Sequence, residues 1–121
     1  MSVLVLAGVG ALGGVGAIAR LLLDGAVSAR ARRGFPWGTL AVNLSGAFAL
    51  GLLVGAALSG DALRFAATGL LGSFTTFSTW AFESHRATED GRMRTGAANF
   101  AASLVLGVSL AWLGRLAGGA L

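Results

Sequence analysis

The sequence predicts an all-α membrane protein with four membrane-spanning helices per subunit, formed by one domain over residues 1–121. Of these 121 residues, 55% are hydrophobic and only 12% are charged, whereas a soluble domain is about a quarter charged. The second observation is a set of four uncharged runs, at residues 1–19, 34–60, 65–82 and 95–114. Each run is about long enough to cross a hydrocarbon core of ~30 Å as a helix.

The composition also excludes several classes of protein. There is no cysteine, and His85 is the single histidine, so neither a thiolate site nor a histidine metal cluster is available. The four short spans leave no room for a soluble catalytic domain, so we expect no enzyme. The net charge is +4, but no polar basic face accompanies it, which argues against a nucleic-acid partner. We therefore expect a multi-pass protein of the cell membrane that acts within the lipid bilayer.

The first two predicted spans cover residues 3–23 and 36–58. In the first span, Gly10 and Gly14 form a small-xxx-small pair that allows another backbone to approach closely. Arg20 lies near its end, where its side chain either snorkels to the interface or faces a wet pore mouth. Pro36 begins the second span at a position where its missing N–H has little effect, and Gly51 and Gly55 form a second close-packing pair.

The third predicted span covers residues 65–82 after a tight turn, and the fourth covers residues 95–114 after a polar loop. In the fourth span, Ser103, Gly107 and Ala111 recur every four residues and form a stripe of small side chains. No internal repeat and no low-complexity tail is visible.

Arginines are unevenly distributed between the two sides that four spans define. The loops after the first and third spans carry six of them, and the opposite side carries Arg64 and Arg115. The six are Arg30, Arg32, Arg33, Arg86, Arg92 and Arg94. Because basic loops tend to stay in the cytoplasm, we expect both termini to lie outside it.

Five hydroxyl residues lie near the middle of the third span, directly after Gly72. They are Ser73, Thr75, Thr76, Ser78 and Thr79. Hydroxyls can bond back to the helix and bend it, and broken backbone is tolerated in a membrane only where it is buried in protein or lines a cavity. We therefore expect the third helix to be broken near its middle, with carbonyl oxygens available to a cation such as Na⁺. Alternatively, the hydroxyls only join neighbouring helices.

Further polar and aromatic residues suggest a pathway for an anion. Phe74, Phe77 and Trp80 recur every three residues, which indicates either ordinary packing or aromatic edges facing an anion. Asn43 lies in an apolar helix and carries two N–H donors; it is either an interhelical bond or a ligand. Thr39 lies one turn before Asn43 in the second span. The fourth span carries further polar side chains, which are Asn99, Ser103 and Ser109.

No carboxylate lies deep in any predicted span, because Glu83 is at an end and Asp24 and Asp61 are in loops. A proton-coupled exporter needs a titratable group inside the membrane. Neutral donors without a proton carrier favour passive conduction, and they favour an anion over a cation.

These motifs together resemble the Fluc/CrcB family of fluoride channels. The resemblance covers residues 13–20, residues 38–43, residues 72–79 with Glu83, and the Asn99, Ser103 and Gly107 pattern, in order along nearly the whole chain. It implies a fluoride-specific ion channel that exports F⁻ passively and lowers intracellular fluoride. It also implies an antiparallel dimer with two pores and a structural, non-transported Na⁺.

The resemblance also implies roles for single residues. Asn43 donates to fluoride and Phe77 offers its ring edge, while Trp80 replaces the second phenylalanine of many members. The polar track is extended by Thr39, Ser78, Thr79, Ser103 and Ser109. Arg20 and Glu83 match positions nearer the pore ends, and the backbone carbonyls of Gly72 and Thr75 hold the Na⁺.

The sequence leaves alternatives open for the dimer partner and for the function. The arginine bias favours a single orientation, so the partner is either a second copy or a related subunit of opposite bias in an antiparallel heterodimer. For the function, the alternatives are a small proton-coupled multidrug-type exporter and a non-conducting subunit of a membrane assembly.

Overall fold

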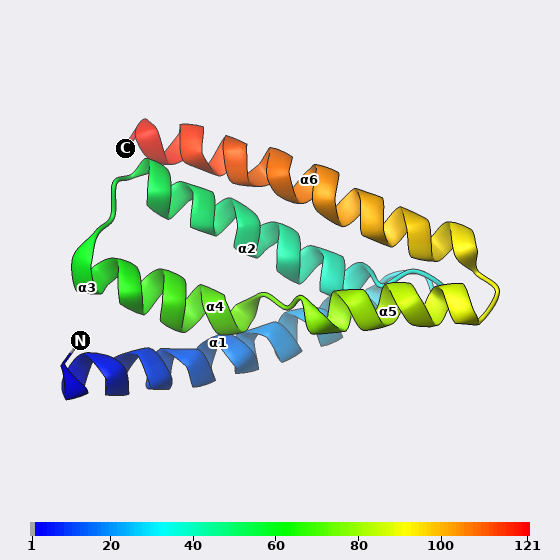
Figure 1. The fold of residues 1–121 in the computed structure, drawn as a ribbon, viewed down its shortest axis with the longest axis horizontal. Coiled ribbons are helices and arrows are strands. Elements are labelled where there is room, and N and C mark those ends of the chain that lie inside the picture. Colours follow the sequence, from blue (N-terminus) through cyan, green and yellow to red (C-terminus); the bar gives the residue numbers. More distant parts are fainter. Residues whose placement is uncertain (1) are drawn as a thin grey trace.

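The computed structural model describes residues 2–121, which form an elongated bundle of helices without any β-strand (Figure 1). Three helices are long and apolar enough to cross a membrane, namely α1 (Val3–Arg30), α2 (Trp37–Gly55) and α6 (Met93–Gly119). A further row of shorter pieces consists of α3 (Gly60–Leu63), the π-helix η1 (Arg64–Leu71), α4 (Gly72–Phe74) and α5 (Ser78–Glu89). The predicted all-α membrane class is therefore confirmed.

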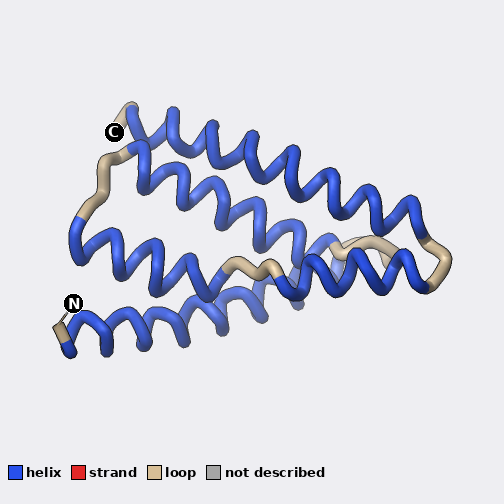
Figure 2. Tube along the Cα trace, viewed as in Figure 1, coloured by secondary structure: helices blue, strands red, loops and turns tan. Residues whose placement is uncertain are grey.

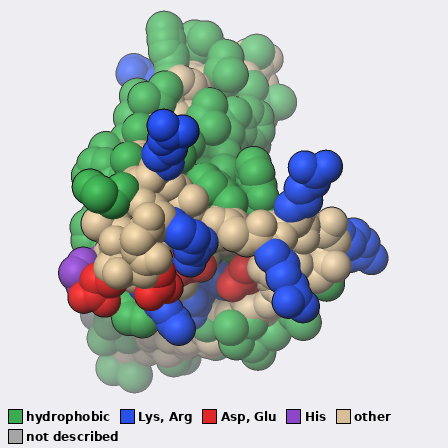
Figure 3. Space-filling model, turned by 90° about the vertical axis from the view of Figure 1, so that its right-hand side faces the viewer, with side chains coloured by type: hydrophobic (Ala, Val, Ile, Leu, Met, Phe, Trp, Pro, Cys, Tyr) green, Lys and Arg blue, Asp and Glu red, His purple; other side chains and the backbone are tan. Residues whose placement is uncertain are grey.

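The two ends of the bundle differ in charge. Both termini and α3 lie at one end, and the α1–α2 connection and the α5–α6 turn lie at the other (Figure 1). Figure 3 faces this second end, where basic side chains gather together with acidic ones. The six arginines of the predicted basic loops belong to the elements at this end. The structure thus keeps the arginine asymmetry that the sequence indicates.

Three helices extend beyond the apolar runs, and one of them is α6, which covers Met93–Gly119 rather than residues 95–114. The helix α1 continues to Arg30, which shortens the connection expected at residues 24–35, and α5 continues to Glu89, well into the polar loop expected at residues 83–94. Polar side chains bond along the added turns of α1, as when the Ser28 hydroxyl donates to Asp24 at 3.1 Å. Hydropathy therefore marks the apolar part of each helix but not its end.

Glycines bring α2 and α6 into backbone contact. A Cβ at Gly51 or Gly55 would collide with the carbonyl oxygens of Ala111 or Arg115 on α6. In the reverse direction, a Cβ at Gly114 would collide with the Phe48 carbonyl oxygen on α2. The predicted close-packing pair in the second span is therefore confirmed, with glycines of α6 as its counterpart.

The shorter pieces η1 and α4, which belong to the broken third helix, pack against α1 through a different glycine from those predicted. Gly10 and Gly14 have no neighbour within 4 Å of a built Cβ among the described residues, whereas a Cβ at Gly16 would collide with the Leu70 carbonyl oxygen and the Ser73 hydroxyl. The predicted pair Gly10 and Gly14 therefore makes no close contact within the described residues, and the close contact of α1 lies at Gly16 instead. This contact fixes η1, a π-helix of the kind often found at functional sites, next to the break.

Candidate functional site

The third helix is interrupted at residues 75–77, between α4 and α5 (Figure 2). Thr75 adopts an extended backbone with φ −78° and ψ 157°. Gly72 stays helical because its N–H bonds to the Ala67 carbonyl, so the break begins after Phe74 rather than at Gly72. The predicted break is confirmed, and its first residue lies within the hydroxyl-rich run.

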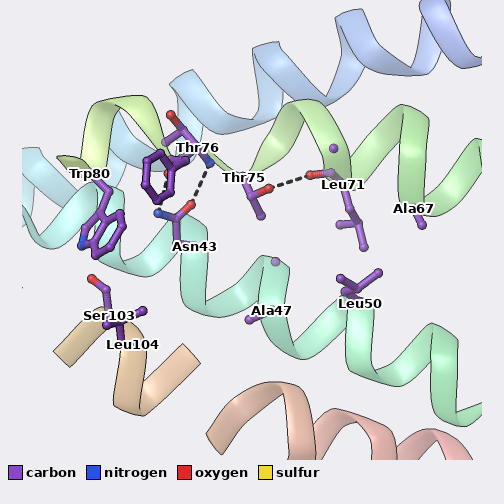
Figure 4. Close-up of a pocket in the computed structure, with 13 residues that line it drawn as sticks. Asn43, Ala47, Leu50, Ala67, Leu71, Thr75, Thr76, Trp80, Ser103 and Leu104 are labelled. Atoms are coloured by element: carbon purple, nitrogen blue, oxygen red, sulfur yellow. Dashed lines mark hydrogen bonds between the residues drawn. The ribbon is translucent and has the colours of Figure 1, made fainter. Parts of the chain in front are cut away.

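Asn43 holds the broken backbone in place. Its Nδ2 donates to the Thr76 carbonyl oxygen at 2.8 Å, and its Oδ1 accepts from the Thr76 N–H at 2.8 Å (Figure 4). One carboxamide thus replaces both helical partners of Thr76, whose backbone N–H and carbonyl would otherwise be unpaired. Because the Nδ2 group has two hydrogens, one N–H donor of Asn43 is not used by this clamp.

Several backbone carbonyls, those of Gly72 and Thr75 among them, lose their usual helical donors at the break. In a continuous α-helix the N–H of residue i bonds to the carbonyl of residue i−4, so Thr76 would serve Gly72 and Thr79 would serve Thr75. The Thr76 N–H binds Asn43 instead, and the Thr79 N–H binds the Thr76 hydroxyl at 3.3 Å. The Gly72 and Thr75 carbonyl oxygens are therefore released from helical bonding.

The aromatic side chains near the break divide into two groups. Phe77 is 75% exposed and makes an edge contact with Trp80, with 5.1 Å between ring centroids and 69° between planes. Trp80 is 7% exposed and also stacks on Phe100, with centroids 5.0 Å apart. Phe74 has the same three-residue spacing in the sequence, but the break separates it from Phe77, so the three rings do not lie along one face of a continuous helix.

A cavity of about 390 Å³ lies beside the break (Figure 4). It gathers six of the predicted residues, which are Asn43, Gly72, Thr75, Phe77, Trp80 and Ser103. Apart from a few polar groups, its walls are apolar. The Ser103 hydroxyl is buried and has no hydrogen-bond partner, so it is a donor available to a molecule in the cavity.

A second cavity, of about 430 Å³, lies at the arginine-rich end. Its lining includes Thr79, Glu83, Arg86 and Arg92. The buried Thr39 hydroxyl donates to a Glu83 carboxylate oxygen at 2.6 Å and so joins α2 to this group. The predicted residues Thr79 and Glu83 therefore line this cavity, Thr39 bonds to Glu83, and Thr79 connects the group to the break through Thr76.

Three other predicted residues are not brought into either cavity. Ser78 is exposed, and the exposed Ser109 donates its hydroxyl to the Val105 carbonyl of its own helix at 2.7 Å. Arg20 is partly buried, and its Nε has no hydrogen-bond partner. The structure thus separates these three side chains from the predicted pathway residues within one chain.

Sequence reasoning missed one buried contact near the break, made by Ser84. Asn99 is 1% exposed and donates from Nδ2 to the Ser84 hydroxyl at 2.8 Å. Ser84 in turn donates to the Trp80 carbonyl at 2.9 Å, and the Trp80 indole N–H donates to the Asn99 carbonyl at 3.3 Å. The four-residue spacing of Trp80 and Ser84 could have indicated that they lie on one face of a helix. The sequence did not indicate that Asn99 on α6 is the partner of Ser84.

Comparison with known proteins assigns the chain to a family. The family model described as "CrcB-like protein, Camphor Resistance (CrcB)" matches residues 7–115. A protein of Mycolicibacterium paratuberculosis named "Fluoride-specific ion channel FluC 2" is 49% identical over 114 residues, which cover 94% of this chain and 93% of that protein.

Two further relatives agree with this assignment. "Fluoride-specific ion channel FluC 2" of Mycobacterium tuberculosis is 46% identical, covering 95% of this chain and 91% of that protein. "Fluoride-specific ion channel FluC" of Geobacter sulfurreducens is 47% identical, covering 87% and 89%. With its helices and its broken segment in this arrangement, the chain belongs to the CrcB family, a family of membrane channels rather than enzymes.

Proposed function

We propose that this chain forms a fluoride-specific channel that lets F⁻ leave the cytoplasm passively and so lowers intracellular fluoride. The observation that carries the proposal is the helix break, which Asn43 holds open beside a cavity with neutral donors. Relatives named as fluoride-specific channels, at 46–49% identity over most of the chain, support it. In an ion-selective pore, fixed groups of the protein replace the hydration shell of the ion.

The groups around the break suit a small, strongly hydrated anion. The second N–H of Asn43 and the unpaired hydroxyl of Ser103 are neutral donors that face the same cavity. The exposed Phe77 ring adds a weakly positive edge without adding a competing charge. Together these groups offer partial positive charge to the anion without a charged side chain.

We assign the entrance to the second cavity. Thr39, Thr79 and Glu83 lie there among arginines that raise the local concentration of anions. Arg20 contributes to the pore ends in the same way. The roles of Ser78 and Ser109 in the polar track require a face that only a partner chain completes, because neither side chain lines a cavity of the single chain.

The proposed topology has four crossings, with the broken row as the third, and both termini outside the cytoplasm. A tag on the C-terminus, probed from both sides of intact cells that express only this chain, tests the orientation. The six-to-two arginine split predicts labelling from the outside alone. Equal labelling of the two faces would contradict a single orientation.

We propose an antiparallel dimer as the conducting unit. Phe77, which faces the pathway, is 75% exposed in one chain, so a second chain is needed to close the pathway around it. The partner is either a second copy or, given the arginine bias, a related subunit inserted in the opposite direction.

We further propose that the Gly72 and Thr75 carbonyls hold a structural Na⁺. These oxygens fit a hard cation because their helical donors are diverted to Asn43 and Thr76, and unwound helices of transporters bind Na⁺ in this way. The ion would supply positive charge that stabilises the break. Vesicles prepared with a large organic cation in place of Na⁺ should lose fluoride efflux, and Na⁺ should restore it; unchanged efflux without Na⁺ would argue against the site.

Growth of cells that lack their own fluoride exporter tests the proposed function. Expression of this chain, alone or with an oppositely inserted relative, should restore growth in fluoride and lower the fluoride content of the cells. A proton-coupled exporter of organic compounds would instead raise resistance to such compounds and leave fluoride toxicity unchanged. A non-conducting assembly subunit would change neither.

A further inference from the structure

Trp80 and Asn99 are joined by two hydrogen-bonded links that run in opposite directions between α5 and α6. In one link, the Trp80 side chain donates to the Asn99 backbone at 3.3 Å. In the other, the Asn99 side chain reaches the Trp80 backbone through the Ser84 hydroxyl, at 2.8 and 2.9 Å. The two links close a ring that fixes the indole relative to both helices.

The ring of hydrogen bonds is buried, so water does not replace its members easily. Asn99 is 1% exposed, and Trp80 and Ser84 are also buried. Without the Ser84 hydroxyl, the Asn99 carboxamide would have no partner at all, because its Oδ1 already lacks one. A buried amide that loses its last hydrogen bond tends to move toward a new partner. One of the two links between α5 and α6 is then lost, and the indole N–H bond alone remains to hold Trp80.

The ring of hydrogen bonds also fixes which part of the Trp80 side chain lines the cavity at the break. Trp80 lines that cavity, whereas Asn99, which receives the indole N–H, does not. The indole therefore offers the cavity an aromatic surface, held against Phe77 and Phe100, while its only donor is used elsewhere. A free indole N–H would add a donor on a larger, mobile side chain, which is poorly suited to select the smallest halide.

We propose that Ser84 and Asn99 are positioning residues that hold the Trp80 side chain in one orientation. In this orientation the indole N–H points away from the fluoride pathway and the indole lies against Phe77. The inference rests on the proposed fluoride channel. Ser84 and Asn99 then influence the selectivity for fluoride without contacting the ion.

The test compares Ser84→Ala in two backgrounds, the parent chain and Trp80→Phe. In the parent, we expect Ser84→Ala to lower the ratio of fluoride to chloride efflux from vesicles about tenfold, as for the loss of one buried hydrogen bond. In the Trp80→Phe background, where no indole N–H can be released, the same substitution should change the ratio much less. A purely structural role of Ser84 would give the same factor in both backgrounds and would overturn the proposal.

A spectroscopic measurement follows the indole directly. With Trp37→Phe and Trp112→Phe, both at exposed positions, Trp80 is the only fluorophore, and Ser84→Ala should shift its emission to longer wavelength. Thr88→Ala is the matched control, because Thr88 donates to the Ser84 carbonyl on the same helix and does not touch Trp80; it should alter neither emission nor selectivity.

The outcomes separate this proposal from the proposed function. If the parent conducts fluoride and Ser84→Ala behaves like Thr88→Ala, the positioning role is wrong and the channel stands. If the parent, with or without a related subunit, conducts no fluoride, the channel function fails and the positioning role fails with it.

Discussion

Channels that carry Asn43→Asp are expected to lose fluoride flux almost completely. At the clamp, a carboxylate oxygen would replace Nδ2 and face the Thr76 carbonyl oxygen, 2.8 Å from the present nitrogen. The new charge would also repel the permeating anion. Two unit charges ~4 Å apart at an effective dielectric constant of ~20 repel by about 4 kcal/mol, which corresponds to roughly a thousandfold decrease in rate.

Fluoride efflux from reconstituted vesicles at neutral pH measures this effect. Asn43→Ala separates the two causes, because it removes the clamp without adding charge and should leave more flux than Asn43→Asp. Ser45→Ala is a control on the same helix, since this exposed hydroxyl bonds only to the backbone of its own helix. Flux of Asn43→Asp equal to that of the parent would show that the ion does not pass Asn43.

The second large effect concerns stability. Gly114→Ala is expected to destabilise the bundle by about 2 kcal/mol, since a methyl group would enter the space of the Phe48 carbonyl oxygen. Backbone atoms of two packed helices cannot turn aside as a flexible side chain can, so α2 and α6 must move apart. The midpoint of thermal unfolding in detergent should fall, together with the yield of the assembled protein.

Gly107→Ala is the matched comparison. Gly107 lies on the same helix α6 as Gly114, but a Cβ at Gly107 would have no neighbour within 4 Å among the described residues. It should unfold at the parent temperature. A larger loss at Gly107 than at Gly114 would place the tightest packing of α6 against a partner chain and would contradict the α2–α6 contact described above.

Local chemistry explains which parts of the fold were predictable. The uncharged runs predicted the helices, and the hydroxyls after Gly72 predicted the break, because both signals lie within a single segment. The helix ends were not predictable from hydropathy, since Ser28 and Glu89 lie on polar turns that continue beyond the apolar runs. The contact of Gly16, rather than Gly10 or Gly14, depends on a neighbouring helix that the spacing does not specify.

The same distinction applies to the site. The unusual position of Asn43 in an apolar helix was visible in the sequence, but its pairing with Thr76 depends on how two distant segments meet. The two interpretations of Asn43, as an interhelical hydrogen bond and as a ligand of the anion, are compatible. One N–H of its carboxamide binds Thr76, and the second N–H remains for an anion. Ser84 was overlooked because it follows the predicted span and gains its role only through Asn99 on α6.

Neutral donors beside a broken helix should allow fluoride to shed its water and cross the membrane without coupling to protons. Ion efflux from vesicles that contain the purified chain, with the membrane potential set and the pH equal on both sides, measures this conduction. We expect rapid, voltage-driven loss of fluoride while chloride is retained. Vesicles that hold fluoride as tightly as empty ones, with and without an oppositely inserted related subunit, or that release it only under a pH gradient, would contradict it.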